Sequence, residues 1–154
     1  MLGAATSLLS DHPAGECYVT LIFAHLVPTT RILTYSNAGP PPGYVLDANG
    51  TVKHRLESTN TFLGIFPEAE FDVAAPVQLD SGDIVVLYTD GILEAMGPDG
   101  TMFGKERLLE VVRANRRHSA QAIVDALCQA ARDFYQGEPQ RDDVTVVVIK
   151  VAET

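Results

Sequence analysis

Apolar and polar positions divide the first part of the chain into extended segments separated by turns. Residues 17–27 form a continuous apolar run, which predicts a buried strand, and residues 31–36 predict a second strand. The intervening residues 28–30 form a turn, so the two strands are expected to form a hairpin. Three prolines at residues 40–42 fix the backbone and remove hydrogen-bond donors, which predicts a loop over residues 37–43.

A second hairpin is predicted further along the chain. Residues 44–46 and 52–56 have a strand-like pattern, and Asn49-Gly50 between them is a strong hairpin-turn signal. No internal repeat and no linker interrupts the sequence, so one domain is expected.

The middle of the chain predicts a central strand. Residues 71–79 read as extended, and residues 80–83 form a turn. Residues 84–88 are apolar at every position, which is typical of a strand covered on both faces. Residues 98–100 mark a loop.

Two helices and a final strand complete the pattern. The first helix is expected at about residues 105–115, and the second follows Ser119, a favourable N-cap. The second helix has an apolar stripe with a period of 3.6 residues, made of Ala120, Ile123, Val124, Leu127, Ala131 and Phe134. Gly137 and Pro139 are expected to end this helix, and residues 144–151 form a β-branched strand. These elements predict an α+β fold.

Composition narrows the class of partner. The chain has 154 residues, a size that suits one domain with a buried core. Hydrophobic residues make up 46% and aromatic residues 7%, so the core should be aliphatic. The formal net charge of -9 repels phosphate backbones, which argues against nucleic acid and anionic membranes as partners.

Cysteine usage and hydropathy indicate a cytoplasmic protein. Cys17 and Cys128 are the only cysteines, and neither has a metal-ligand neighbour at a recognised spacing, so both are expected to be reduced thiols. No apolar stretch approaches the roughly 20 residues of a membrane-spanning helix. The first ten residues lack a basic region and do not resemble a signal peptide.

Aspartates stand at the ends of two predicted strands. Asp90 follows the strand at residues 84–88, and Asp142 and Asp143 precede the last strand. If these strands are antiparallel neighbours, the aspartates meet at one edge of the sheet, about 4–8 Å apart, where oxygen ligands select Mg²⁺ or Mn²⁺. Gly91 would allow a sharp turn where a metal needs room. Aspartates are also common in ordinary turns, so the spacing alone leaves both interpretations open.

The residues around these aspartates resemble the SpoIIE-like branch of the metal-dependent protein phosphatase (PPM) family. The motifs that carry the resemblance follow the family's order over nearly the whole chain: residues 18–21 (YVTL), 35–42 (YSNAGPPP), 79–95 (LDSGDIVVLYTDGILEA), 103–108 (FGKERL) and 141–148 (RDDVTVVV). A lone Thr-Asp-Gly would carry no weight, whereas the ordered set is specific.

The resemblance implies a β-sandwich flanked by helices, with metal ions at one end. It makes Asp90 and Asp142 metal ligands, with Asp143 at the adjacent position that is not a ligand. It also implies a two-metal site for Mn²⁺ or Mg²⁺, in which the cations activate a bridging water for attack on phosphorus. The implied substrate is phosphoserine or phosphothreonine on a bacterial regulatory protein, such as an anti-sigma-factor antagonist in partner switching.

The chain departs from the family's pattern in two ways. The Gly-Gly-Asp-like strand, whose aspartate bridges both metals, and the Ser-Gly-His-Gly-like segment are absent from residues 1–154. Residues 1–10 resemble the tail of the helix that follows the latter segment, so we expect an N-terminally truncated domain with weak or no activity on its own. At Pro40 the family commonly has a histidine or an aspartate, and proline offers no side-chain ligand.

Two functions from different classes follow. The first is a metal-dependent serine/threonine protein phosphatase whose full-length parent is active. The second is a non-catalytic, phosphatase-like module that binds a regulatory partner. Truncation is also expected to bare a strand edge near residues 17–27, which favours a homo-oligomer.

Overall fold

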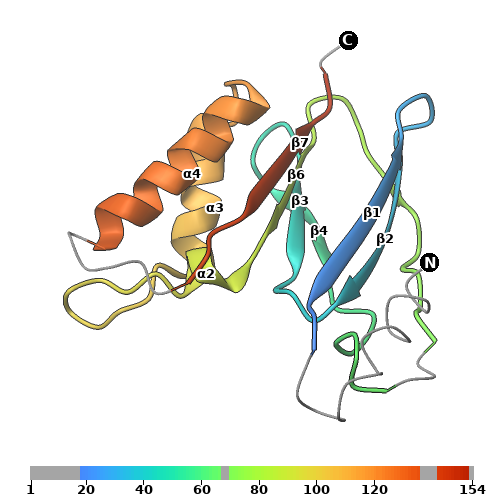
Figure 1. The fold of residues 1–154 in the computed structure, drawn as a ribbon. Helices are drawn as coiled ribbons and strands as arrows, with labels where there is room; N and C mark the ends of the chain where they lie inside the picture. Colours follow the sequence, from blue (N-terminus) through green and yellow to red (C-terminus); the bar gives the residue numbers. More distant parts are fainter. Residues whose placement is uncertain (1–17, 67–69, 136–141, 153–154) are drawn as a thin grey trace. The chain divides into compact units, whose positions relative to one another are not determined.

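The computed structural model describes residues 18–66, 70–135 and 142–152 (Figure 1). The chain divides into two compact units. Among the described residues, the first comprises residues 18–42, 56–66 and 70–79, and the second comprises residues 43–55, 80–135 and 142–152. Each unit contains one antiparallel sheet.

The sheet of the first unit has the strand order β1-β2-β5, with β1 at Leu21–Val27, β2 at Ile32–Ala38 and β5 at Val77–Gln78. Strands β1 and β2 pair antiparallel from Leu21↔Ala38 to Val27↔Ile32, which confirms the predicted hairpin. The predicted burial of the first strand is wrong, because β1 is the end strand of the described sheet and Phe23 is 46% exposed. Cys17 lies outside the described residues.

Two predicted boundaries in this unit differ from the structure. Strand β2 extends to Ala38, so the proline loop is shorter than expected. The extended segment predicted at residues 71–79 contributes only the two residues of β5. Its earlier part is held by other bonds: the Asp72 N–H donates to Asn60 Oδ1 at 2.7 Å, and the Ala74 N–H donates to the Tyr35 carbonyl at 2.8 Å.

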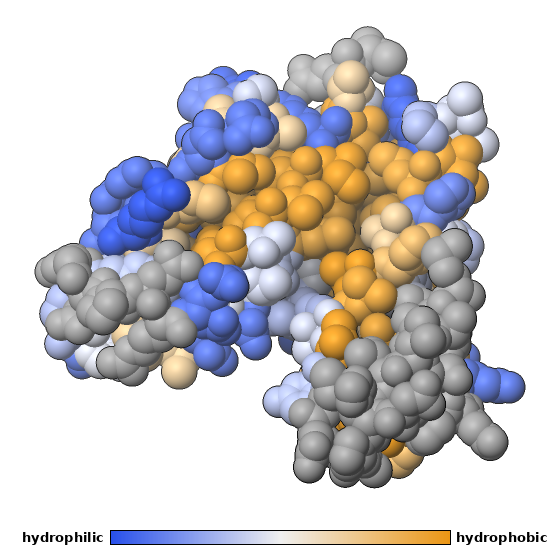
Figure 2. Space-filling model, in the orientation of Figure 1, coloured by the Kyte–Doolittle hydropathy of each residue, from blue (hydrophilic) through white to orange (hydrophobic). Residues whose placement is uncertain are grey.

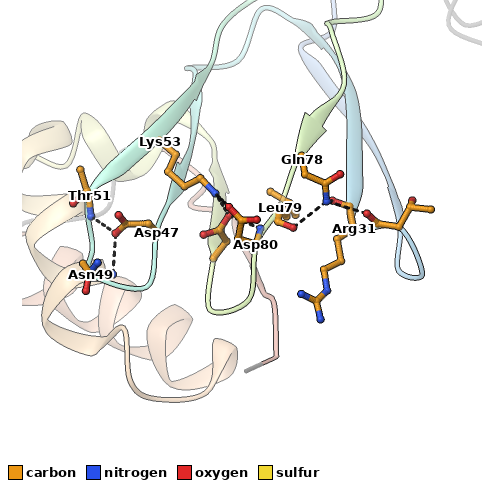
Figure 3. A network of polar contacts seen from close by, with 10 residues as sticks. Arg31, Asp47, Asn49, Thr51, Lys53, Gln78, Leu79 and Asp80 are labelled. Carbon is orange, nitrogen blue, oxygen red and sulfur yellow. Dashed lines mark hydrogen bonds and ion pairs between the residues drawn. The ribbon is translucent and has the colours of Figure 1, made fainter. Parts of the chain in front are cut away.

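The sheet of the second unit has the strand order β4-β3-β6-β7. Its strands are β3 at Gly43–Leu46, β4 at Val52–Leu56, β6 at Ile84–Tyr88 and β7 at Val146–Lys150. The turn between β3 and β4 is closed by the Asp47 carboxylate, which accepts the N–H groups of Asn49 and Thr51 at 2.8 Å (Figure 3). The predicted Asn-Gly hairpin is confirmed. All five residues of β6 are buried, as the uniform apolar run predicted.

Three helices belong to the second unit in the described part of the chain: α2 at Asp90–Leu93, α3 at Gly104–Asn115 and α4 at Ala120–Tyr135. The N-cap prediction for α4 is confirmed, because Ser119 Oγ accepts the Ala122 N–H at 3.2 Å. Helix α4 packs against both α3 and β7. The predicted ending at Gly137 and Pro139 lies outside the described residues.

The core of the second unit lies between its sheet and its helices. Fully buried members include Leu46, Ile84, Val86, Ile92, Leu108, Ile123 and Leu127. Seen as in Figure 2, apolar side chains gather over β7, whereas hydrophilic side chains predominate on the outer side of α4. Two antiparallel sheets and three described helices confirm the predicted α+β class. Among the described residues, no helix has the length and apolar character that crossing a membrane requires.

Candidate metal centre

The pairing of β6 with β7 determines where the predicted ligands lie. The two strands are antiparallel neighbours, with Tyr88 opposite Val146 and Ile84 opposite Lys150. The end of β6 therefore lies beside the start of β7. This confirms the strand arrangement on which the metal hypothesis depends, and it places the Asp90 and Asp142 segments at one edge of one sheet.

Asp90 begins a short helix that the sequence pattern did not predict. Thr89 has an extended backbone, and the chain turns directly from β6 into α2 at Asp90. The Asp90 carbonyl accepts the Glu94 N–H at 2.9 Å, which closes the single helical turn. Threonine followed by aspartate after a strand is a helix-start signal, but four residues are too few for a periodic pattern. The Asp90 side chain is exposed.

Gly91 makes a close backbone approach that the sequence did not predict. Its φ is not in the left-handed region, and it lies inside α2. A Cβ on Gly91 would lie 2.4 Å from the carbonyl oxygen of Asp143 and 3.5 Å from the carbonyl carbon of Asp142. A hydrogen atom in place of a side chain therefore lets the helix start approach the backbone of the Asp142 segment closely.

Thr89 connects the same two segments, a role that was not predicted from the sequence. The Thr89 N–H donates to the Thr145 carbonyl at 3.1 Å, and the Thr145 N–H donates to Thr89 Oγ1 at 3.0 Å. The Thr89 hydroxyl in turn donates to the Asp143 carbonyl at 3.2 Å. Only its place in the Thr-Asp-Gly motif marked this residue in the sequence.

Asp142 lies in the exposed segment that leads into β7. Its Oδ1 accepts the Asp143 N–H at 2.8 Å, which fixes the orientation of one carboxylate oxygen. Asp143 is also exposed, and its carbonyl faces Thr89 and Gly91. The separation between the Asp90 and Asp142 carboxylates stays a prediction.

The chemistry of these side chains fits a hard divalent cation in part. Two exposed carboxylates at one sheet edge offer the oxygen ligands that Mn²⁺ and Mg²⁺ take, without the nitrogen or sulfur that would select zinc. Within residues 18–66, 70–135 and 142–152, no group of three or more His, Cys, Asp or Glu residues is arranged to hold a metal ion. If Asp90 and Asp142 are ligands, as predicted, the described residues supply only part of a metal site.

Comparisons with known proteins agree with the motifs. The profile of the family described as Stage II sporulation protein E (SpoIIE) matches residues 1–152. Protein IcfG of Synechocystis sp. is 31% identical over 142 residues, which cover 92% of this chain and 22% of IcfG. Phosphoserine phosphatase RsbU of Bacillus subtilis is 24% identical over 136 residues, which cover 88% of this chain and 40% of RsbU. The chain therefore spans well under half the length of these relatives.

Solved structures show the same fold. The SiaA-PP2C domain of Pseudomonas aeruginosa matches 97% of this chain and 57% of its own, with a TM-score of 0.79 and 23% identity. The PP2C phosphatase domain of SpoIIE from Bacillus subtilis, solved with a fragment of its regulatory domain, matches 97% of this chain and 42% of its own, with a TM-score of 0.78 and 23% identity. On the extent of the family match, the chain belongs to the SpoIIE family.

Proposed function

We propose that residues 1–154 form one partial phosphatase domain of a metal-dependent protein that removes phosphate from phosphoserine or phosphothreonine. The observation that carries the proposal is the meeting of the Asp90 and Asp142 segments at one edge of the β6–β7 pair. The names of RsbU and RsbP, both phosphoserine phosphatases of Bacillus subtilis, support the reaction class.

In this proposal the carboxylates of Asp90 and Asp142 hold Mn²⁺ or Mg²⁺. A bound cation of this kind makes water a better nucleophile and neutralises charge on a phosphoryl group. The residues around the carboxylates set their positions: Thr89 bonds to the Asp143 carbonyl, and Gly91 leaves room for it. The exposure of both aspartates leaves the edge accessible to a phosphorylated side chain on another protein.

The proposed substrate is a phosphorylated regulatory protein of a bacterial partner-switching system, such as an anti-sigma-factor antagonist. The family match and the names of the relatives support this choice. The net charge of -9 disfavours nucleic acid as a competing partner. We also propose a cytoplasmic location, where such regulators act, and self-association through the edge of β1.

We expect the 154 residues alone to turn over slowly, even with Mn²⁺ added. A two-metal reaction needs cations held about 3.5–4 Å apart, and these residues contain no Gly-Gly-Asp-like strand to bridge them. The absence of a Gly-Gly-Asp-like motif from these residues also supports the second candidate, a non-catalytic module that binds a regulatory partner. That candidate predicts partner binding that is indifferent to Mn²⁺ and to both aspartates.

The test is Mn²⁺ titration followed by paramagnetic broadening of backbone amide signals, which detects weak sites. Broadening should centre on residues 89–91 and 142–145, and it should be lost in Asp90→Asn and in Asp142→Asn. Asp125→Asn is the matched control, because Asp125 is an exposed aspartate on α4 and the charge change is the same. Release of phosphate from a phosphoserine peptide, measured in parallel, should be reduced by Asp90→Asn and by Asp142→Asn and should be unchanged by Asp125→Asn. Broadening that is unaffected by either aspartate substitution would contradict the proposal.

A further inference from the structure

We propose that Thr89 is a positioning residue for the metal site, and that its hydroxyl holds the Asp90 segment in register with the Asp142 segment. The inference deepens the proposed function and rests on it. Thr89 itself offers no ligand in this scheme. It acts through the backbone atoms of Asp143 and Thr145 that it binds.

The hydroxyl of Thr89 replaces a missing backbone acceptor. In a regular antiparallel pair, every second pair of opposite residues exchanges two backbone hydrogen bonds, and Thr89 and Thr145 occupy such a position. Thr89 donates one such bond to the Thr145 carbonyl, but its own carbonyl accepts the Ile92 N–H at 3.4 Å as α2 begins. The Thr145 N–H therefore donates to Thr89 Oγ1 instead, at 3.0 Å. The strand turns into a helix without losing its bonds to Thr145, the residue that directly precedes β7.

The same hydroxyl makes a second bond. A hydroxyl has one donor and can accept through its lone pairs, and here it accepts from Thr145 while it donates to the Asp143 carbonyl at 3.2 Å. A threonine at the start of a helix ordinarily caps an N–H of its own helix. Thr89 makes no such cap bond. Both hydrogen bonds of its side chain are instead made to residues 143–145.

These bonds act directly beside both predicted ligands. Thr89 precedes Asp90 in the chain, and the carbonyl that it binds belongs to the residue after Asp142. Gly91 adds close backbone contact on the other side of Asp90. The backbone on either side of Asp90 is thus fixed against the Asp142 segment. Groups that orient metal ligands in this way typically change metal affinity by about 10–100-fold when they are removed.

Two substitutions separate the hydroxyl from the shape of the side chain. Thr89→Val keeps the branched shape but leaves the Thr145 N–H without its acceptor and the Asp143 carbonyl without this donor. Thr89→Ser keeps both bonds and removes only a methyl group. We expect Thr89→Val to weaken Mn²⁺ binding by about tenfold or more, and Thr89→Ser to stay within about threefold of the unsubstituted chain.

The experiment measures Mn²⁺ affinity by amide line broadening in the unsubstituted chain and in the Val, Ser and Asp90→Asn variants. Amide hydrogen exchange at Thr145 is measured without metal, and circular dichroism verifies that each variant is folded. We expect faster exchange at Thr145 and weaker Mn²⁺ binding in Thr89→Val, with Thr89→Ser close to the unsubstituted chain in both respects.

Three other outcomes have distinct meanings. A folded Thr89→Val variant with unchanged Mn²⁺ affinity would overturn the positioning role, even if exchange at Thr145 became faster, because the bond would then serve only the fold. Equal losses in Thr89→Ser and Thr89→Val would also overturn it, because the methyl group would then be responsible. If Mn²⁺ broadens no signals near Asp90 in the unsubstituted chain, the proposed metal site itself is wrong, and the positioning role fails with it.

Discussion

The ammonium nitrogen of Lys53 lies 2.6 Å from the carboxylate of Asp83, whose side chain is only 1% exposed. The same Asp83 oxygen accepts the Asp80 N–H at 2.8 Å. Lys53 also reaches Asp80 at 2.6 Å, as Figure 3 shows, but the Asp80 side chain is 73% exposed. One lysine of β4 thus joins a buried and an exposed carboxylate, and the buried one holds the turn that leads into β6.

The two carboxylates should differ strongly in their contribution to stability. Asp83→Ala leaves Lys53 without its buried partner and the Asp80 N–H without its acceptor, so we expect a loss of about 3 kcal/mol. Asp80→Ala is the matched control, and it should cost less than about 1 kcal/mol because that pair is solvated. Urea unfolding of both variants provides the measurement. Similar losses for the two substitutions would show that burial of Asp83 has little energetic weight.

The same ion pair predicts a dependence of stability on alkaline pH. Burial lowers the pKa of Lys53, but the hydrogen bonds from its ammonium group to Asp80 and Asp83 and the two negative charges outweigh this, so the pKa is raised above its ordinary value. A pKa that is higher in the folded state contributes stability that is complete below the unfolded pKa and is lost as pH rises through the folded pKa.

The free energy of unfolding should therefore fall above about pH 10.4, the ordinary pKa of lysine. The free energy of unfolding should be measured by urea unfolding at several pH values between about 8 and about 11.5, because this range brackets the ordinary pKa of lysine. In Lys53→Met this lysine-dependent part of the fall should disappear. Tyr88 should contribute a decrease in the same direction in both chains, because burial and the neighbouring Tyr44 raise its pKa. Identical pH profiles with and without Lys53 would contradict the prediction.

Gly91→Ala should push the two predicted ligand segments apart. The added Cβ would meet the Asp143 carbonyl oxygen at 2.4 Å, and a backbone atom cannot move aside as a flexible side chain can. We expect a loss of stability of about 1–3 kcal/mol, together with weaker Mn²⁺ broadening at Asp90.

Gly100→Ala is a useful comparison for that variant. Its Cβ would meet nothing within 4 Å, but its φ of +76° makes a side chain costly, by about 1–2 kcal/mol. This substitution should therefore reduce stability and leave Mn²⁺ broadening unchanged. If both variants weaken Mn²⁺ binding equally, general destabilisation rather than the contact at Gly91 is responsible.

Arg107 should stabilise the turn that follows α2. Its Nη1 donates to the carbonyls of Met102 and Phe103 at 2.9 and 3.0 Å, and its guanidinium carbon lies 4.8 Å from the centre of the Phe134 ring. Arg107→Lys keeps the charge but cannot reproduce the planar, stacked geometry, so we expect a loss of about 1 kcal/mol. The exposed Arg117, changed to lysine in the same way, should alter stability by less than about 0.5 kcal/mol. Thermal unfolding of both variants measures the two losses, and equal losses would contradict the prediction.

The parts of the fold that the sequence predicted well are those with dense local signals. The uniform apolar run at residues 84–88, the stripe on α4 and the Asn-Gly turn each determine an element without reference to distant partners. Antiparallel pairing of β6 and β7 then places Asp90 near Asp142 by geometry alone. Confirmation of that pairing is therefore the strongest link from the sequence to the candidate site.

The predictions that were wrong or incomplete concern features that depend on contacts between distant residues, which a local pattern does not encode. Burial of β1 depends on what lies beside it, which an apolar run does not encode. Residues 71–76 form no strand, because side chains satisfy part of their backbone: Asn60 Nδ2 and Ser36 Oγ both donate to the Asp72 carbonyl at 2.9 Å. The role of Thr89 was missed because its hydroxyl stands in for a carbonyl that turns away into α2, and no composition or spacing signals that substitution.

The pairing of β6 with β7 also has a kinetic consequence. Between these strands the chain forms α3 and α4, which contact each other and can form early from local interactions. The β6–β7 ladder instead requires closure of the long loop that contains both helices, and this closure carries an entropic cost. We therefore expect the helical pair to assemble first and the edge with Asp90 and Asp142 to form late. During folding, the two predicted ligands would then stay apart until nearly all of the second unit is in place.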